Sequence, residues 1–469
     1  MHRRQVSFFM LLGWLAGSVA LAADPTPERP NVLFIAIDDL RDWVHYLGAN
    51  EQVRTPHLDR LAARGLSFTH SYCAAPVCNP SRAALMSGLR PWSTGVYGND
   101  IDWRQAIGQT TTLPMHFMQN GYYVAGAGKI YHESFRRPSD WSAYFDKEHG
   151  DPKLPNDADP GVGGIRFAPL DCQDEDMADY GSVSYTLEQL NREHDKPFFL
   201  ACGLHKPHMP WNVPRKYYDL YPLAEIQLPK VLKNDLDDIP ASGVKMAKPE
   251  GDHAAMVRSG RWKEAVQGYL AAITFADAMI GRLMDGFDQS KYAKNTIVVL
   301  WCDHGWHLGE KEHWRKFALW EEATRSPLIF VVPGMTQPGA VCNRTVDFMS
   351  IYPTLADLCG LSIPKHVEGP SIRPLLAQPD AAWDRPALTT HGYKNHAVRT
   401  ERWRYIRYAN GDEELYDHQS DPHEWVNLAS KPELAGTKTE LARWLPTSNA
   451  PQAAKTADKR EKKSGKKKR

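Results

Sequence analysis

Five short, continuous apolar runs constrain the fold of this chain more than any other feature. They end at a polar residue or at Pro-Gly and cover residues 31–37, 122–127, 198–204, 296–302 and 328–332. Runs of this kind are typical of strands buried on both faces, so we predict a largely parallel sheet covered by helices. Apolar residues recur at helical spacing in residues 57–63, 264–287 and 351–358, which predicts helices that cover the sheet. The class is therefore α/β.

Polar residues follow four of these runs directly. The first run stops at Asp38 and Asp39, the second at Gly128-Lys129, the third at His205, and the fourth at Asp303 and His304. Ligands of open α/β sheets bind at the carboxyl ends of the strands, so we expect these side chains to gather at one edge. Carboxylates in this number favour a hard divalent cation, calcium or magnesium rather than zinc.

A cysteine begins a second chemically notable stretch, Cys78-Asn-Pro-Ser-Arg82, which continues to Gly88. Pro80 suits the first position of a helix and Gly88 its C-cap, which predicts that Cys78 lies just outside the helix N-terminus. Negative charge is favoured there. With Arg82 one turn further on, Cys78 is either a thiolate of low pKa or the precursor of another group.

The pattern Cys-x-Pro-Ser-Arg resembles the signature of type I, formylglycine-dependent sulfatases. Further motifs occur in the order typical of that family, and the later ones are most similar to the iduronate-2-sulfatase branch. They are Asp38-Asp39, Gly128-Lys-Ile-Tyr-His132, His205-Lys-Pro-His208, Asp303-His-Gly-Trp-His-Leu-Gly-Glu310 with Lys316, and Leu415 to Leu428. The similarity spans roughly residues 30–430, and ordered motifs in this number are specific.

The resemblance implies an alkaline-phosphatase-like sulfatase fold, with a large mostly parallel sheet flanked by helices and a smaller C-terminal antiparallel sheet. We place the catalytic domain at residues 23–339 and the C-terminal subdomain at 340–446. The implied activity is hydrolysis of O-sulfate esters, on sulfated carbohydrates as substrate. A maturation enzyme would convert Cys78 to formylglycine, whose hydrate attacks sulfur and forms a covalent sulfo-enzyme intermediate. In that family a calcium ion, with magnesium as the alternative, would bind Asp38, Asp39, Asp303, His304 and the residue formed from Cys78.

The same resemblance assigns roles to further residues. Arg82 and Lys129 would orient and stabilise the hydrate, and Lys129, His205 and Lys316 would hold the sulfate oxygens. His205 would also protonate the leaving group, while His132 would assist breakdown of the intermediate. We expect the sugar to contact Trp306, His307 and an arginine such as Arg315 or Arg399.

Two alternatives stay open. One is a phosphate or phosphonate ester hydrolase of the same fold, which usually has a Ser or Thr nucleophile and two metals; Cys78 argues against it. The other is a non-catalytic protein that binds sulfated glycans, which requires Cys78 to stay unmodified. Without Arg3, Arg4 and residues 455–469, the chain has 45 basic and 54 acidic residues, a net charge of −9. A nucleic-acid partner is therefore not expected.

Both ends of the chain are distinctive. Arg3 and Arg4, an apolar stretch at 6–16 and Ala20-Leu-Ala22 predict a cleaved signal peptide at 1–22, with export to the periplasm or the extracellular space and no stable membrane anchor. An uncleaved anchor is the alternative. The basic composition near the C-terminus predicts disorder over residues 447–469.

Three further expectations concern local structure. Residues 397–408 and 414–417 flank Asn410-Gly411 and predict a β-hairpin with its arginines on an exposed face. The stretches 136–170 and 205–250 are rich in Pro, Gly and Asp, which predicts long loops over the site that set specificity. Among seven cysteines, Cys202 and Cys302 lie in apolar runs and are expected to be buried free thiols.

Overall fold

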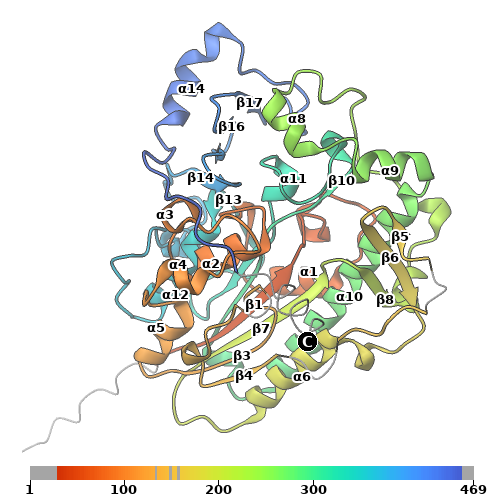
Figure 1. The fold of residues 1–469 in the computed structure, drawn as a ribbon. Coiled ribbons are helices and arrows are strands. Elements are labelled where there is room, and N and C mark those ends of the chain that lie inside the picture. Colours follow the sequence, from red (N-terminus) through yellow and green to blue (C-terminus); the bar gives the residue numbers. More distant parts are fainter. Residues whose placement is uncertain (1–28, 133–134, 147–149, 156–158, 457–469) are drawn as a thin grey trace, which may run out of the picture.

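The computed structural model describes residues 29–132, 135–146, 150–155 and 159–456. The predicted signal peptide and the tail beyond residue 456 lie outside these ranges. An eight-stranded sheet forms the centre, in the order β13-β2-β12-β9-β1-β7-β3-β4 (Figure 1). Its strands are β1 Asn31–Asp38, β2 Leu66–Tyr72, β3 Tyr123–Gly128, β4 Ala143–Phe145, β7 Phe198–Pro207, β9 Thr296–Cys302, β12 Leu328–Val331 and β13 Ala340–Asp347.

The prediction of a largely parallel sheet is confirmed. Strands β9, β1, β7, β3 and β4 are successive parallel neighbours. β12 is antiparallel to both β9 and β2, and β13 is parallel to β2. Each of the five apolar runs forms one of these strands, because a strand covered on both faces has no polar side.

Helices cover the two faces of the sheet (Figure 1). In β1, Leu33, Ile35 and Ile37 belong to one core, while the alternate residues belong to the other, as the two-residue period of a strand requires. The first core includes α1 Pro56–Ala62, α6 Ala178–Asn191 and α10 Trp262–Gln289. The second includes α2 Cys78–Ser87, α5 Leu113–Gln119 and α12 Ile351–Leu358.

A smaller antiparallel sheet lies toward the C-terminus, as expected. Its strands follow chain order: β14 Ala387–Thr390, β15 His396–Arg399, β16 Trp403–Arg407 and β17 Glu413–Asp417. The Asn410-Gly411 turn joins β16 to β17, but residues 397–408 form two strands rather than one. The small sheet begins at Ala387 and not near residue 340, because β13 belongs to the large sheet. Helix α14, Ala435–Ala442, packs on it.

The prediction of an exposed arginine face on this sheet holds for Arg402 and Arg407 but not for Arg399 and Arg404. Arg404 is fully buried and Arg399 is 3% exposed. Arg404 donates to both Glu321 and Glu424, and Arg399 Nε donates to Glu321 Oε2 at 3.2 Å. Glu321 begins α11, Glu321–Thr324, so these buried ion pairs attach the small sheet to the catalytic part.

The two stretches predicted as long loops contain ordered elements. β5 Gly161–Val162, β6 Ile165–Leu170 and β8 Trp211–Pro214 form a three-stranded sheet, and α7 Arg215–Tyr218 and α8 Ala241–Ala247 follow. The other short elements are α3 Pro91–Thr94, α4 Trp103–Ile107, α9 Asp252–Ser259, α13 Arg373–Ala377, β10 His307–Leu308 and β11 Trp314–Arg315.

Order also extends past residue 447, where disorder was predicted. The backbone N–H groups of Ala450, Ala453 and Thr456 donate to carbonyls of residues 92, 95 and 100 at 2.7–2.9 Å. Within the described residues, all seven cysteines are free, and Cys202 and Cys302 are buried as predicted. No helix in the described ranges has the length and apolar content needed to span a membrane.

Candidate active site

The carboxyl ends of β1 and β9 place four polar residues side by side. Ile37 pairs with Cys302, so Asp38-Asp39 and Asp303-His304 leave neighbouring strands at the same level. The Asp39 N–H donates to Asp303 Oδ1 at 3.1 Å, and Tyr269 Oη of α10 donates to the Asp39 carbonyl at 2.7 Å. These bonds fix the turn in which Asp39 has a φ of 61°.

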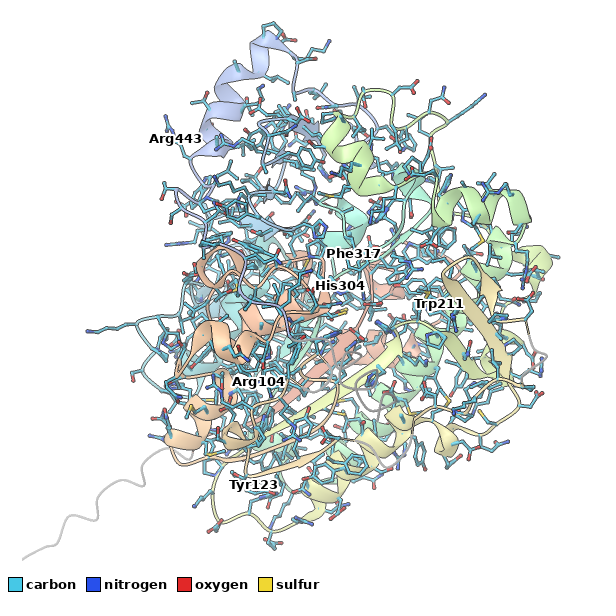
Figure 2. The ribbon with its side chains drawn as sticks, viewed as in Figure 1. Arg104, Tyr123, Trp211, His304, Phe317 and Arg443 are labelled. Atoms are coloured by element: carbon cyan, nitrogen blue, oxygen red, sulfur yellow. The ribbon has the colours of Figure 1, made fainter. Side chains whose placement is uncertain are left out.

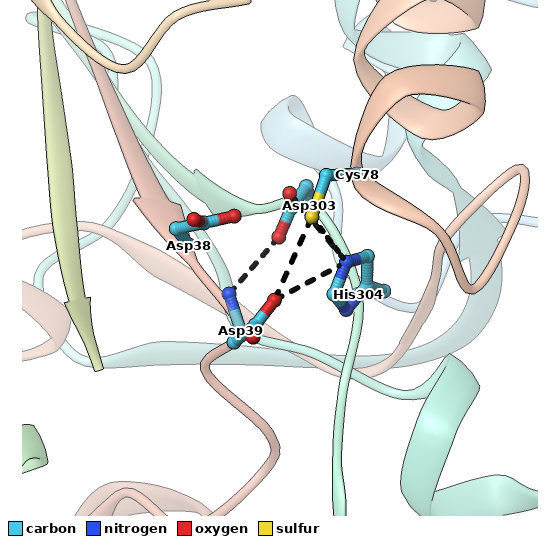
Figure 3. A group of neighbouring side chains, drawn as sticks. All are labelled: Asp38, Asp39, Cys78, Asp303 and His304. Carbon is cyan, nitrogen blue, oxygen red and sulfur yellow. Dashed lines mark hydrogen bonds and ion pairs between the residues drawn. The ribbon is translucent and has the colours of Figure 1, made fainter. Parts of the chain in front are cut away.

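Helix α2 brings Cys78 to these strand ends (Figure 3). The helix begins at Cys78 itself rather than at Pro80, and Gly88 closes it with a φ of 74°. Ser81 Oγ donates to the Asp303 carbonyl at 2.6 Å, which ties the first turn to β9. Cys78 Sγ thereby lies 3.4 Å from His304 Nε2 and 3.8 Å from Asp39 Oδ1.

A group of five buried residues offers ligand atoms that all lie within 4.8 Å of one another: Asp38, Asp39, Cys78, Asp303 and His304. Asp39 Oδ2 is buried and has no hydrogen-bond partner among the described residues. Burying an unpaired carboxylate oxygen is costly, so this atom calls for a positive partner. Three carboxylates with one imidazole fit a divalent cation, and the oxygen-rich set favours calcium or magnesium.

Three cationic side chains surround this acidic group. Arg82 donates from Nε to Asp303 Oδ2 at 2.8 Å and from Nη2 to Asp38 Oδ1 at 3.2 Å. Lys129 Nζ donates to Asp38, and Lys316 Nζ lies 2.7 Å from Asp39 Oδ1 and 3.0 Å from Cys78 Sγ. The Arg82 guanidinium thus binds two carboxylates of the protein, whereas Lys316 contacts the predicted nucleophile directly.

Burial and these charges shift the ionisation of the group. Burial would raise the pKa of Asp38, but the charges of Lys129 and Arg82 outweigh it and hold that pKa well below its ordinary value. For Asp39, burial raises the pKa despite the opposing charge of Lys316. Burial likewise raises the pKa of the Cys78 thiol against the charge of Lys316. A raised pKa does not favour a thiolate at Cys78 in this environment.

The histidine nearest the acidic group is His208 rather than His205. β7 continues to Pro207, which pairs with Asp38, so His208 follows the strand end directly. Its Nε2 lies 3.7 Å from Asp39 Oδ2. The His205 ring lies 3.9 Å from Asp179, which also accepts the His205 N–H at 2.7 Å. The motif His205-Lys-Pro-His208 contained the signal, but its spacing did not show where the strand ends.

His132 also lies close to this centre. Burial, together with the charges of Lys129 and Lys316, lowers the pKa of His132 to about 3, although Asp38 opposes the shift. The ring is therefore neutral at physiological pH. Its proximity to the Lys129 charge agrees with its expected place in the site.

Three residues expected to bind substrate are buried and contact other residues of the protein. Trp306 is 1% exposed and packs against Trp211, which is labelled in Figure 2, with ring centroids 5.8 Å apart. His307 is fully buried, and its Nδ1 lies 3.1 Å from the Glu310 carbonyl. Arg399 forms the buried pair with Glu321 described above. The sequence motif placed the first two next to the candidate metal ligands Asp303 and His304, and the turn after β9 directs them inward. Exposure gives no support to substrate contact at these three residues, and that expectation stays a prediction.

Comparison with known proteins identifies the family. A family model described as Sulfatase matches residues 30–361, and one described as N-sulphoglucosamine sulphohydrolase, C-terminal, matches residues 309–450. A sulfatase of Formosa agariphila is 40% identical over 447 residues, covering 90% of this chain and 87% of the relative. Iduronate 2-sulfatase of Homo sapiens is 30% identical over 423 residues, covering 77% of this chain and 75% of the relative.

The fold has close structural counterparts. One solved structure, described as a complex with its substrate D-glucosamine-2-N,6-O-disulfate, superposes with a TM-score of 0.72 at 21% identity, covering 89% of this chain and 96% of its own. The family models, the two relatives and the arrangement at the ends of β1 and β9 agree. This chain belongs to the sulfatase family, and it is a sulfuric ester hydrolase.

Proposed function

We propose that the protein hydrolyses O-sulfate esters of sulfated carbohydrates, with the matured form of Cys78 as its nucleophile. The observation that carries the proposal is the position of Cys78 Sγ, 3.0 Å from Lys316 Nζ and inside the five-residue acidic group. A buried thiol with a raised pKa is a poor nucleophile, since the thiolate is the reactive form. A residue placed for attack but unreactive as a thiol supports the proposal that a maturation enzyme converts Cys78 to formylglycine.

The matured residue supplies the chemistry that a thiol lacks, because the hydrate of its aldehyde has one hydroxyl to attack sulfur and a second through which sulfate is later expelled. A calcium or magnesium ion held by Asp38, Asp39, Asp303, His304 and residue 78 would offset sulfate charge and acidify the hydroxyl. Arg82 donates hydrogen bonds to Asp38 and Asp303 and thereby orients these two carboxylates, so it is a positioning residue.

Lys316 and Lys129 supply positive charge that stabilises the transition state more than the bound substrate. As the bond from sulfur to the ester oxygen breaks, negative charge grows on the oxygens, and fixed ammonium groups in a buried site stabilise it. Lys316 also remains protonated: burial would lower its pKa, but Asp39 raises it above the ordinary value. Lys316 contacts Cys78 and Asp39, and Lys129 contacts Asp38. Both lysines can therefore hold oxygens of a sulfate group that is bound next to residue 78.

His208 is the proton carrier in this proposal, in place of His205. Its Nδ1 lies 2.5 Å from the Met209 carbonyl, which requires a hydrogen on Nδ1 and leaves the Nε2 lone pair free for a proton. Burial and the charges of Lys129 and Lys316 lower the pKa of His208, so the ring starts neutral. Nε2 accepts the proton of the attacking hydroxyl and returns it to the departing alkoxide. His132 assists the later release of sulfate.

The substrate class is inferred from relatives. The human relative is named for 2-sulfated iduronate, and the structural counterpart is described with a disulfated glucosamine. Both are sulfated sugars of glycosaminoglycan type, so we propose a sulfated sugar or polysaccharide here. We further propose export across a membrane before action, on the composition of residues 1–22.

The mass of one tryptic peptide tests this function. The peptide from Gly65 to Arg82 contains Cys78 and is to be measured in protein from its natural host, alongside sulfate release from aryl sulfates and sulfated sugars. We expect an aldehyde in place of the Cys78 thiol, together with sulfate release. An intact thiol in all of the protein, without sulfate release, would overturn the proposal and favour a glycan-binding role. Faster release of phosphate or phosphonate than of sulfate would favour the alternative hydrolase.

A further inference from the structure

A cavity of about 810 Å³ adjoins the chain segment that carries Lys316, and none of the five residues of the acidic group lines it. Its walls come from three places: residues 242–253 around α8 and α9, residues 313–317 around β11, and residues 391–410 of the small sheet. This volume is in the range of pockets that bind small ligands. The catalytic part and the C-terminal sheet both contribute to it.

Segment 313–317 connects the cavity to the nucleophile. Arg315 and Phe317 line the cavity, while the intervening Lys316 is 4% exposed and reaches Cys78. The Phe317 N–H donates to the Pro76 carbonyl at 3.1 Å, two residues before Cys78. Lys316 therefore contacts the candidate nucleophile, while the residues on either side of it line the cavity.

Positive charge dominates the cavity lining. Lys245, Lys248 and Arg315 contribute three cations, and Asp252 is the single acidic residue among the described lining residues. Arg315 Nε donates to Asp252 Oδ2 at 2.6 Å, which compensates one of the three. Lys245 and Lys248 are exposed, and among the described residues neither forms an ion pair within 4.0 Å. Two cations thus remain uncompensated.

Neutral groups complete the lining. Burial lowers the pKa of His391 to about 4, with the nearby charge of Lys248 adding to the shift, so this imidazole is uncharged. Phe317 adds an apolar face next to it. An apolar ring beside hydrogen-bonding and cationic groups is the usual composition of a sugar-binding pocket, because one face of a sugar ring is apolar and its edge is polar.

We propose that this cavity binds a second anionic group of the substrate, a carboxylate or a second sulfate on the sugar whose ester lies at Cys78. Lys248 and Lys245 attract that group, and Phe317 packs against the sugar ring. The inference rests on the proposed function and makes it more specific: the protein selects doubly anionic sugars over sugars whose sole charge is the cleaved sulfate. Arg315 holds the wall of the cavity through its pair with Asp252.

Substrate pairs that differ by one anion test this selection. One pair is a hexuronate 2-sulfate and the corresponding hexose 2-sulfate; the other is a disulfated and a monosulfated glucosamine. The readout is the ratio of kcat/KM within each pair for the matured protein and for Lys248→Met and Lys245→Met. We expect the native protein to prefer the doubly anionic member, and each substitution to lower that ratio by about tenfold, the usual effect of one charged contact.

Lys294→Met is the matched control, because Lys294 is exposed just before β9, at the end of the sheet opposite the site. It is expected to keep the native ratio. If the substitutions lower the kcat/KM ratio of the hexuronate pair alone, the bound anion is a carboxylate. If they lower the ratio of the glucosamine pair alone, it is a second sulfate. Ratios near one in the native protein, or ratios unchanged by both substitutions, would overturn the inference. Absence of sulfate release from every substrate, aryl sulfates included, would instead overturn the proposed function.

Discussion

The ammonium group of Lys316 lies 3.0 Å from the sulfur of Cys78, although 238 residues separate them in the chain. Its second partner is Asp39, at 2.7 Å. Lys316 therefore bridges the residue to be matured and a metal-ligand candidate. Because the side chain is 4% exposed, its charge acts through protein rather than water, which strengthens its effect on a neighbouring anion.

Lys316→Met is expected to reduce kcat for sulfate release by at least about 100-fold, since removing one fixed donor from a developing anion typically has that effect. The measurement is steady-state kinetics with an aryl sulfate, after mass analysis has shown that residue 78 is matured. Lys216→Met, an exposed lysine paired with Asp174, is the control and should retain native kcat. A loss below fivefold in Lys316→Met would contradict the proposed role.

His208→Gln and His205→Gln separate the two histidines of one motif. We expect a fall of about 100-fold or more in kcat for His208→Gln, the usual contribution of a proton-transferring group. His205→Gln should lose much less, because it keeps the backbone N–H that donates to Asp179, and it is the His208 ring that lies 3.7 Å from Asp39. Rates of both matured variants on the same aryl sulfate decide between them. A larger loss in His205→Gln would return the role to that residue.

Asp179 predicts a pH dependence of stability. Burial, reinforced by Asp151, raises the pKa of Asp179 to about 7, against an ordinary value of 3.8. The native state therefore holds a proton that the unfolded state loses first, so this contribution is complete below pH 3.8 and disappears as pH rises through about 7.

Asp179→Asn should flatten the change in the free energy of unfolding between about pH 4 and about pH 8 by up to about 4 kcal/mol. Denaturant titrations of both proteins across that range measure it. The pH dependence of the free energy of unfolding is compared, not its absolute value. The reason is that the side-chain amide of the Asp179→Asn variant can accept only one of the two backbone hydrogen bonds that the Asp179 carboxylate accepts. Parallel pH curves for the two proteins would contradict the raised pKa.

Two arginines on the small sheet form a matched pair for stability. Arg404 is fully buried between Glu321 and Glu424, whereas Arg402 is exposed and pairs with Asp417 at 2.7 Å. Arg404→Met should destabilise the protein by about 3–5 kcal/mol, because it removes the buried guanidinium that pairs with both carboxylates. Arg402→Met should cost less than about 1 kcal/mol. Equal losses in denaturant unfolding would contradict this account.

Removal of divalent cations should lower the melting temperature. Asp38, Asp39 and Asp303 place three carboxylates within one buried group, so a bound cation stabilises the native state by mass action. Differential scanning calorimetry with a chelator, then with added calcium or magnesium, measures the shift and its recovery. Asp303→Asn is expected to reduce that recovery. A melting temperature indifferent to both chelator and cation would argue against a metal at this position.

Local patterns in the sequence determined the main elements of the fold. Continuous apolar runs identified strands β1, β3, β7, β9 and β12, and three- and four-residue spacing identified α10, because burial on one or two faces leaves a periodic trace in the chain. The ordered motifs indicated the family and the edge of the sheet at which Asp38, Asp39, Cys78, Asp303 and His304 meet.

Tertiary structure decided which side chains point into the site. The pairing of Asp38 with Pro207 carries β7 past His205 and places His208 beside Asp39. Partners distant in the chain bury Arg399, and the turn after β9 buries Trp306 and His307. The same assembly creates the cationic cavity around Lys248 from three separate segments. Register and packing between distant segments are properties of the whole fold, so no local pattern records them.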